Sequence, residues 1–253
     1  MRRKSHLTDD LIALQRQLPR RQLLQWLGGA ALLAGCGADM TGGQCVEIPE
    51  ETEGPYPGDG SNGVNALALS GIVRNDLRTS FGSGSATAGG VPLTIELTLT
   101  NVTDGCSPLA GYAIYLWHCD REGRYSLYSQ GVTNENYLRG VQETDSEGRV
   151  TFTTIFPGCY AGRWPHAHFE VFPSLASASS HSAKVATSQL ALPQTECAAV
   201  YATTGYDDSV RNLAGVTLAS DGIFRDGYSA QLASLTGNVT DGYVASLVFG
   251  ITP

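Results

Sequence analysis

The residues with the clearest chemical potential lie between Tyr160 and His168. His166 and His168 are separated by a single residue, and on a β-strand this spacing places both imidazoles on the same face. Two imidazoles on one face can bind one metal ion. The same spacing also occurs on ordinary half-solvated strands, so the pair alone leaves both interpretations open.

Two upstream tyrosines favour the metal interpretation. Tyr137 and Tyr160 precede the histidines, and a phenolate is a hard anionic oxygen donor that suits ferric iron. Two phenolates, two imidazoles and a solvent oxygen would give an Fe(III) site with a net charge near zero. In the alternative interpretation both tyrosines are buried aromatics tethered through their hydroxyls, and Arg163 is a surface ion-pair partner.

The motifs around these residues resemble those of the intradiol ring-cleavage dioxygenases. The resemblance is carried by Tyr-Leu-Arg-Gly from residue 137, Thr-Asp-x-x-Gly from residue 144, Pro-Gly-x-Tyr from residue 157 and Gly-Arg-x-x-His-x-His from residue 162. It extends to Thr-Glu-Gly-Pro-Tyr from residue 52, to residues 116–125 and to residues 187–190. In motif form it covers most of residues 45–195.

The resemblance implies a metal site and an activity. The ligands of a non-haem Fe(III) would be Tyr137, Tyr160, His166 and His168, and the chelating substrate would displace Tyr160. With O2, the enzyme would cleave a catechol between its two hydroxylated carbons and give a cis,cis-muconate.

The resemblance also implies the pocket residues. Arg163 would lie over the bound ring and stabilise negative charge on it, and Gln189 would line the same pocket. Gly54, Pro55 and Tyr56 would lie near the pocket mouth and contact the substrate.

Two other functions stay open at this point. A β-sandwich binding module at the cell surface would keep the fold, with or without the metal, but would lack oxygenase activity. A copper or zinc protein is disfavoured because two tyrosine ligands suit neither metal well.

Short segments of β character dominate the chain after residue 46. Strands are predicted where β-branched or alternating patterns occur between Asp-Gly and Glu-Gly turns. Examples are residues 93–99, 111–117, 149–155, 166–172 and 243–249. Residues 80–90 and 174–187 are predicted as exposed loops, and residues 196–201 as the one short helix. The expected fold is all-β, a single antiparallel β-sandwich with long loops over residues 47–253.

A signal peptide is predicted to precede this domain, at residues 1–35. Arg20-Arg21 comes before an apolar run at residues 23–34, which is shorter than the ~20 residues that span a bilayer and resembles a twin-arginine export signal. Leu33-Ala34-Gly35-Cys36 resembles a lipobox, which would make Cys36 the lipidated first residue of the mature protein. An ordinary cleaved signal is the alternative.

The rest of the leader region and the charge fit an exported protein. The Gly-rich residues 36–46 are predicted to form a tether, and the expected location is the cell envelope or outside the cell, with membrane contact only through Cys36.

The 253-residue chain has a net charge of −8. Residues 1–35 contain six Lys/Arg and two Asp, a net of +4, which leaves −12 on residues 36–253. This acidic balance argues against nucleic acid as a partner.

The remaining cysteines and polar residues receive structural interpretations. Five cysteines follow the lipobox without a C-x-x-C pair, which allows at most two disulfides of unassigned pairing: Cys45, Cys106, Cys119, Cys159 and Cys197. His118 is predicted to be structural. Asp221 and Asp226 are predicted to be solvated turn carboxylates.

Overall fold

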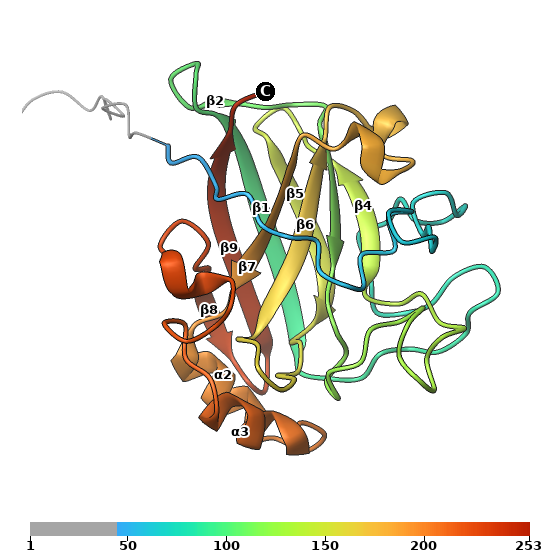
Figure 1. The fold of residues 1–253 in the computed structure, drawn as a ribbon, viewed down its shortest axis with the longest axis vertical. Helices are drawn as coiled ribbons and strands as arrows, with labels where there is room; N and C mark the ends of the chain where they lie inside the picture. The colour runs from blue at the N-terminus through green and yellow to red at the C-terminus, as the bar shows by residue number, and fades with distance from the viewer. Residues whose placement is uncertain (1–44) are drawn as a thin grey trace, which may run out of the picture. The chain divides into compact units, whose positions relative to one another are not determined.

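The structure, a computed structural model, describes residues 45–253. Its strands form two sheets (Figure 1), one with five strands in the order β2-β1-β9-β8 with β5 also paired to β1, and one with four strands in the order β4-β3-β6-β7. The strands of the larger sheet are β1 (Pro92–Asn101), β2 (Ser107–Pro108), β5 (Arg149–Ile155), β8 (Ser234–Asn238) and β9 (Gly242–Ile251). Those of the smaller sheet are β3 (Ala113–Trp117), β4 (Arg139–Glu143), β6 (His166–Phe172) and β7 (Ala186–Ala191).

The apolar core lies between the two sheets. On β1 the alternate residues Leu93, Ile95, Leu97 and Leu99 are almost fully buried, because successive side chains of a strand point to opposite faces. From the other sheet Phe169 packs against Phe249, with ring centroids 4.8 Å apart. The predicted all-β sandwich is confirmed, although β1 and β9 run parallel rather than antiparallel.

Helical segments occur only in the connections of the described chain. They are η2 (Leu175–Ser177), η3 (His181–Ala183), α2 (Gln194–Tyr201), α3 (Asp207–Ala214) and η4 (Phe224–Asp226). Helix α2 contains the predicted helical residues 196–201. The expectation that no further helix would follow was wrong: α3 starts with Asp207 and Asp208, whose negative charges favour a helix N-terminus. In Figure 1, α2 and α3 lie together at one end of the strands.

The predicted signal peptide, Cys36 and the first nine residues of the predicted tether lie outside the described residues. Between residues 45 and 253, no helix is long and apolar enough to cross a membrane.

Residues 45–59, here named the strap, cross the outer face of the four-stranded sheet (blue in Figure 1). The strap is bonded to β7: the Glu51 N–H donates to the Thr187 carbonyl at 2.8 Å, and the Gln189 amide donates to the Thr52 carbonyl at 3.0 Å. All seven residues of β6 are buried. The face of β6 that points away from the core is therefore enclosed as well.

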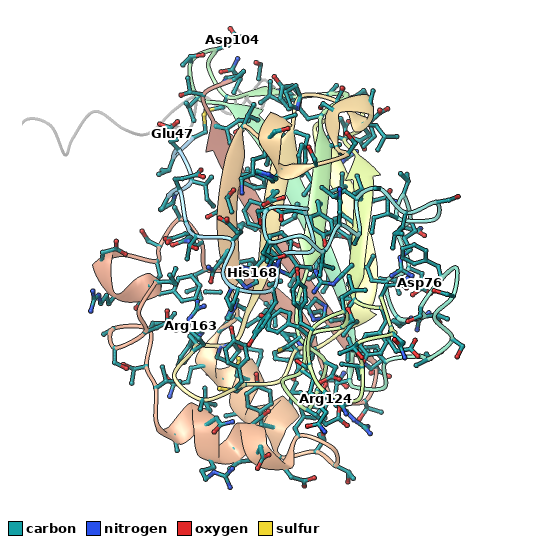
Figure 2. The ribbon with its side chains drawn as sticks, turned by 45° about the vertical axis from the view of Figure 1, so that its right-hand side comes forward. Glu47, Asp76, Asp104, Arg124, Arg163 and His168 are labelled. Atoms are coloured by element: carbon teal, nitrogen blue, oxygen red, sulfur yellow. A yellow bond between two sulfur atoms is a disulfide. The ribbon has the colours of Figure 1, made fainter. Side chains whose placement is uncertain are left out.

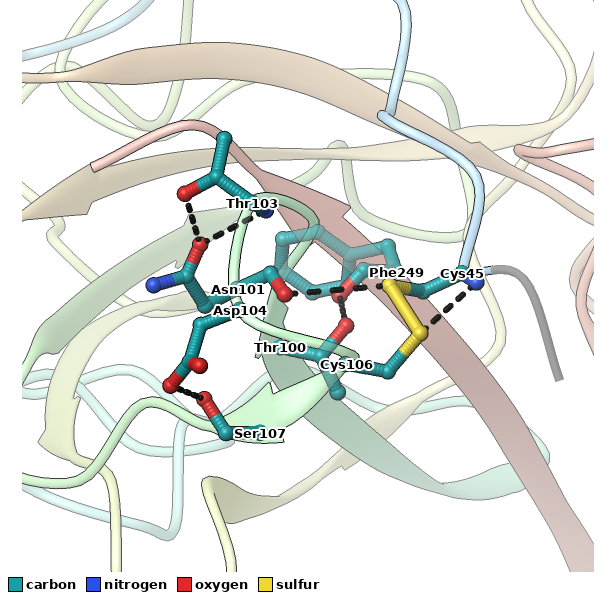
Figure 3. The surroundings of a disulfide bond; sticks show 8 residues. All are labelled: Cys45, Thr100, Asn101, Thr103, Asp104, Cys106, Ser107 and Phe249. Carbon is teal, nitrogen blue, oxygen red and sulfur yellow. Dashed lines mark hydrogen bonds between the residues drawn. A yellow bond between two sulfur atoms is a disulfide. The ribbon is translucent and has the colours of Figure 1, made fainter. Parts of the chain in front are cut away.

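A disulfide fixes the start of the strap. Cys45 is bonded to Cys106, which follows the turn at the end of β1, over a sequence separation of 61 residues (Figure 3). The Cys45 and Cys106 sulfurs lie beside the hydrogen-bonded turn of Asn101 and Thr103. Cys119, Cys159 and Cys197 are buried free thiols. One of the two disulfides that the sequence allows is therefore formed.

Removal of this disulfide is expected to lower the free energy of unfolding by about 2–4 kcal/mol, because the bond limits the unfolded chain over a long loop. Urea titration of the Cys45→Ser/Cys106→Ser variant measures the loss. Reductant should lower the stability of the wild type toward that of the variant and leave the variant unchanged. Equal stability of the two oxidised proteins would contradict the expectation.

Candidate metal centre and active site

One row of register partners crosses the outer face of the four-stranded sheet. Trp117 pairs with Arg139 on one side and with His168 on the other, and His168 pairs with Gln189. The Trp117 indole stacks on the His168 imidazole at 4.9 Å, with the planes 6° apart. The row therefore fixes the plane of the His168 ring, near the centre of the view in Figure 2.

His166 and His168 occupy the outer face of β6, opposite the core residues of the same strand. Their Nε2 atoms are 3.0 Å apart. The Tyr160 hydroxyl lies 3.2 Å from Nε2 of His166, and the Tyr125 hydroxyl lies 3.3 Å from Nε2 of His168. The two hydroxyls are 3.4 Å apart. Four donor atoms thus form a closed ring, here named the donor cluster: Tyr125, Tyr160, His166 and His168.

The structure does not bring Tyr137 to the donor cluster, which corrects the sequence-based assignment. The Tyr137 hydroxyl donates to Oδ2 of Asp120 at 3.0 Å, and its ring packs in a separate apolar group with Val132 and Ile155. Burial and the adjacent Asp120 carboxylate raise the pKa of Tyr137. A carboxylate neighbour stabilises the neutral phenol, which is the opposite of what a metal-bound phenolate requires.

Sequence reasoning missed Tyr125 as the fourth donor. Tyr125 and Tyr137 share the connection between β3 and β4, and Tyr137 lies two residues before β4 begins. The available signal was the turn before Tyr125: Asp120 accepts from the backbone N–H groups of Glu122 and Arg124, which closes the loop and directs the next residue inward.

The donor cluster is uncharged in the absence of a cation. Burial, followed by the nearby Arg163 charge, lowers the pKa of His166 to about 3, and burial together with His166 lowers the pKa of His168. Burial raises the pKa of Tyr160 to about 12 and also raises the pKa of Tyr125 well above its usual value. Nδ1 of His166 contacts the Trp164 carbonyl, which requires a donated N–H there. Its Nε2 lone pair therefore faces the cluster.

The donor cluster fits a trivalent metal ion. Donors that share one ion at about 2 Å lie roughly 3 Å from one another, which matches the observed separations of 3.0–3.4 Å. A bound cation lowers the pKa of its ligands, so it would convert both phenols to phenolates, which would offset two of its three positive charges. In residues 45–253 no group of three or more His, Cys, Asp or Glu is arranged to hold a metal; the donor cluster contains two such residues, His166 and His168.

Arg163 lies beside the cluster and is held on two sides. Its Nε donates to Oδ2 of Asp221 at 2.9 Å and its Nη2 donates to Oε1 of Gln189 at 2.5 Å. Asp221 is fully buried, so the expectation of a solvated turn carboxylate was wrong. Burial alone would raise the pKa of Asp221, but backbone N–H groups of Trp164 and Ile223 and the Arg163 charge lower it. The carboxylate therefore stays ionised and orients the guanidinium.

The strap forms part of the wall around the donor cluster. A Cβ added to Gly54 would lie 3.5 Å from Cε1 of His168, so the backbone passes directly over this ring. The Tyr56 ring lies 5.0 Å from the Tyr125 ring and is 37% exposed. The Pro55 carbonyl accepts from the Asn62 amide and makes no hydrogen bond to a donor-cluster side chain. Gly54 and Tyr56 are thus placed beside the cluster.

The hydrogen bonds of the His118 ring go to residues outside the donor cluster, and His118 is expected to make stability depend on pH. Burial lowers its pKa to about 4, and its ring bonds to the Cys119 carbonyl and the Thr154 hydroxyl. In the unfolded chain the His118 imidazole becomes protonated below about pH 6.5, whereas in the folded protein it stays neutral until about pH 4. The metal-free protein should therefore lose about 3 kcal/mol through this group as the pH falls across that range.

Urea titrations at several pH values between 7 and 4 measure this loss. His118→Gln keeps an amide that can bond to both neighbours, and its stability should fall less steeply with pH than that of the wild type. Parallel curves would show that His118 contributes nothing to the pH dependence.

Comparison with known proteins identifies the family. Residues 70–200 match the sequence profile of the family described as Dioxygenase. The chain belongs to this family, the intradiol ring-cleavage dioxygenases, and is an oxidoreductase of the kind that cleaves catechol rings. This confirms the enzyme interpretation over a binding module.

Solved structures show the same fold. An intradiol ring-cleavage dioxygenase from Tetranychus urticae superposes with a TM-score of 0.64 at 23% sequence identity, covering 83% of this chain and 96% of that one. The dioxygenase domain of a dioxygenase and carbohydrate-binding fusion protein from Streptomyces sp. SirexAA-E gives a TM-score of 0.51 at 22% identity, covering 81% of this chain and 98% of that one.

Proposed function

We propose that this enzyme binds non-haem Fe(III) through Tyr125, Tyr160, His166 and His168, and that it inserts O2 between the hydroxylated carbons of a catechol to give a cis,cis-muconate. The observation that carries the proposal is the closed ring of two imidazole nitrogens and two phenol oxygens, 3.0–3.4 Å apart. Bound there, ferric iron would withdraw electron density from the diol so that O2 can attack the ring.

Tyr160 is the donor best suited to give way to substrate. It is half-buried and lies in the connection before β6, whereas Tyr125, His166 and His168 are each at most 3% exposed. A phenolate that leaves a cation regains its high proton affinity, so the Tyr160 oxygen can accept a proton from an incoming diol. Tyr125 and the histidines would stay in place during this exchange.

Arg163 would stabilise negative charge that develops on the ring oxygens. Asp221 and Gln189 hold its guanidinium in place before substrate arrives. Preorganised donors of this kind cost no reorganisation during the reaction. The Gln189 amide also bonds the strap through the Thr52 carbonyl, so one residue links the arginine, the strap and the row that contains His168.

The test is a visible spectrum of iron-loaded protein, followed by O2 uptake with catechol, protocatechuate and hydroxyquinol. Two phenolate ligands are expected to give a broad ligand-to-metal absorption band that shifts when a diol is added without O2. A protein that retains ferric iron and stays colourless would overturn the ligand set. A coloured protein without O2 uptake on any of the three diols would overturn the proposed reaction.

We also propose that the protein is exported and anchored by a lipid on Cys36. The support is the paired arginines, the short apolar run and the lipobox-like sequence before Cys36. Expression in a bacterium with an inhibitor of lipoprotein signal peptidase should shift the wild type to slower migration. Cys36→Ser is the matched control and should not respond. An unchanged wild type would contradict the anchor.

A further inference from the structure

Arg139 is a buried guanidinium whose five N–H groups are all hydrogen-bonded. It is 1% exposed. Nε donates to the Ser126 hydroxyl at 3.1 Å, and Nη1 donates to the Pro57 carbonyl at 2.7 Å and to the Tyr115 hydroxyl at 3.0 Å. Nη2 donates to the Tyr56 carbonyl at 2.9 Å and to the Ser126 carbonyl at 3.0 Å. The side chain has no donor left for any other partner.

Four of these five acceptors come from the two segments that carry the aromatic wall of the donor cluster, and the fifth, the Tyr115 hydroxyl, belongs to β3. Tyr56 and Pro57 belong to the strap, and Ser126 follows the cluster residue Tyr125. The rings of Tyr56 and Tyr125 are neighbours at 5.0 Å. One rigid planar group therefore sets the separation of the strap and the residue after Tyr125.

The residues around the Arg139 guanidinium leave room for it and accept its hydrogen bonds without neutralising its charge. In the described part of the chain, no carboxylate lies within ion-pair distance of Arg139, so its charge is balanced only by neutral oxygens, an arrangement that is costly for stability alone. Gly58 has φ +65°, and a Cβ there would lie 2.9 Å from Nη1. Leu138, just before Arg139, holds a left-handed backbone at φ +57°. Such strain persists where the surroundings fix one conformation.

We propose that Arg139 is a positioning residue that holds Tyr125 and Tyr56 in the geometry needed for metal binding and diol entry. This inference rests on the proposed function. The backbone of Tyr137 supports the same segment, because its carbonyl accepts from the Ser126 hydroxyl at 2.7 Å. Arg139 touches neither the reacting atoms nor the donor atoms and acts only through the two segments. A lysine cannot replace it, because one ammonium cannot reach five acceptors in a planar fork.

The first measurement is hydrogen–deuterium exchange of the metal-free protein. In Arg139→Lys, amide exchange in residues 54–60 and 124–128 should rise together by about tenfold or more. Arg74→Lys is the matched control, because Arg74 also donates to carbonyls, those of Arg139 and Asn136, but contacts neither segment. It should lower the melting temperature and leave exchange in both segments unchanged.

The second measurement uses iron-loaded protein. Arg139→Lys should shift the phenolate absorption band and raise the KM for catechol by about tenfold or more, whereas Arg74→Lys should change neither. Tyr115→Phe removes one acceptor of Arg139 without changing volume; it should fold and shift the band less. If Arg139→Lys and Tyr115→Phe both keep wild-type exchange, band and KM, the positioning role is overturned. A wild type without a band or O2 uptake would overturn the proposed function, and the exchange result would still decide the role of Arg139.

Discussion

Tyr125→Phe is expected to lower the affinity for ferric iron by more than the roughly 10–100-fold typical of outer hydrogen-bond partners, and to reduce catechol turnover to background. The reason is the loss of one of the four donor atoms, 3.3 Å from Nε2 of His168 and 3.4 Å from the Tyr160 hydroxyl. In the variant, Tyr160 supplies the one remaining phenolate of the cluster, so less negative charge compensates the trivalent cation. Iron titration and the intensity of the visible band measure the effect.

Tyr137→Phe is the matched control for this prediction. It removes the same atom from a tyrosine in the same connection, but one whose hydroxyl bonds Asp120. It should cost about 1 kcal/mol of stability while iron and colour are retained. If Tyr137→Phe loses iron and Tyr125→Phe keeps it, Tyr137 is a ligand and the donor cluster described here is not the metal site.

Arg163→Gln is expected to keep iron and colour and to lower kcat for catechol by about 10²–10³-fold, the usual effect of removing a preorganised charge-stabilising donor. The guanidinium contacts Asp221 and Gln189 rather than a donor-cluster atom, so the metal site should survive its loss. Asp221 keeps the backbone N–H groups of Trp164, Ile223 and Phe224 as donors, which limits the cost to folding. Single-turnover kinetics with a pre-bound diol would separate the chemical step from binding.

Arg211→Ala controls for the loss of a positive charge. Arg211 is largely exposed and pairs with Asp208 on the surface of α3, so its removal should leave kcat unchanged. A fully active Arg163→Gln variant would show that the charge on the ring is stabilised elsewhere.

The strands that the sequence predicted are those with strong alternation and turns at both ends. Residues 149–155 and 166–172 match β5 and β6 at both ends. Strands β4 and β7, like the short β2 and β8, were not among the strand-like segments singled out in the sequence. The first three residues of β4 are buried, although the first of them is the charged Arg139. All six residues of β7 are buried, although three of them are the polar Thr187, Ser188 and Gln189. Their polar residues are buried by the strap and by Arg163, which only tertiary structure supplies.

The positions of the site residues could be predicted on a strand, where the alternation of side chains fixes the face on which they lie. They could not be predicted in a long loop, where no such local rule applies. Two residues on one strand share a face whatever the rest of the chain does, so the pairing of His166 with His168 followed from spacing. Tyr125 and Tyr137 lie in a connection of about twenty residues, and nothing local decides which one turns toward β6. The bond between Tyr137 and Asp120 decides it in the folded protein.

The same limit applies to the charged residues around the site. Asp221 precedes a glycine, a pattern typical of exposed turns, yet it is buried against Arg163. Arg139 stands in a motif that resembles the family, but its hydrogen bonds to the strap join residues more than 80 positions apart. Such partners become neighbours only after the sandwich has formed.

The covalent link between Cys45 and Cys106 has a mechanical consequence. It joins the start of the strap to the turn at the end of β1, so a pulling force on the chain upstream of residue 45 passes into the five-stranded sheet. The hydrogen bonds between the strap and β7 carry none of that load. With the bond reduced, the same tension would first break the hydrogen bonds that join Val46 and Ile48 to Gly250 of β9. It would then separate the strap from β7, progressing from Glu51 toward Gly54.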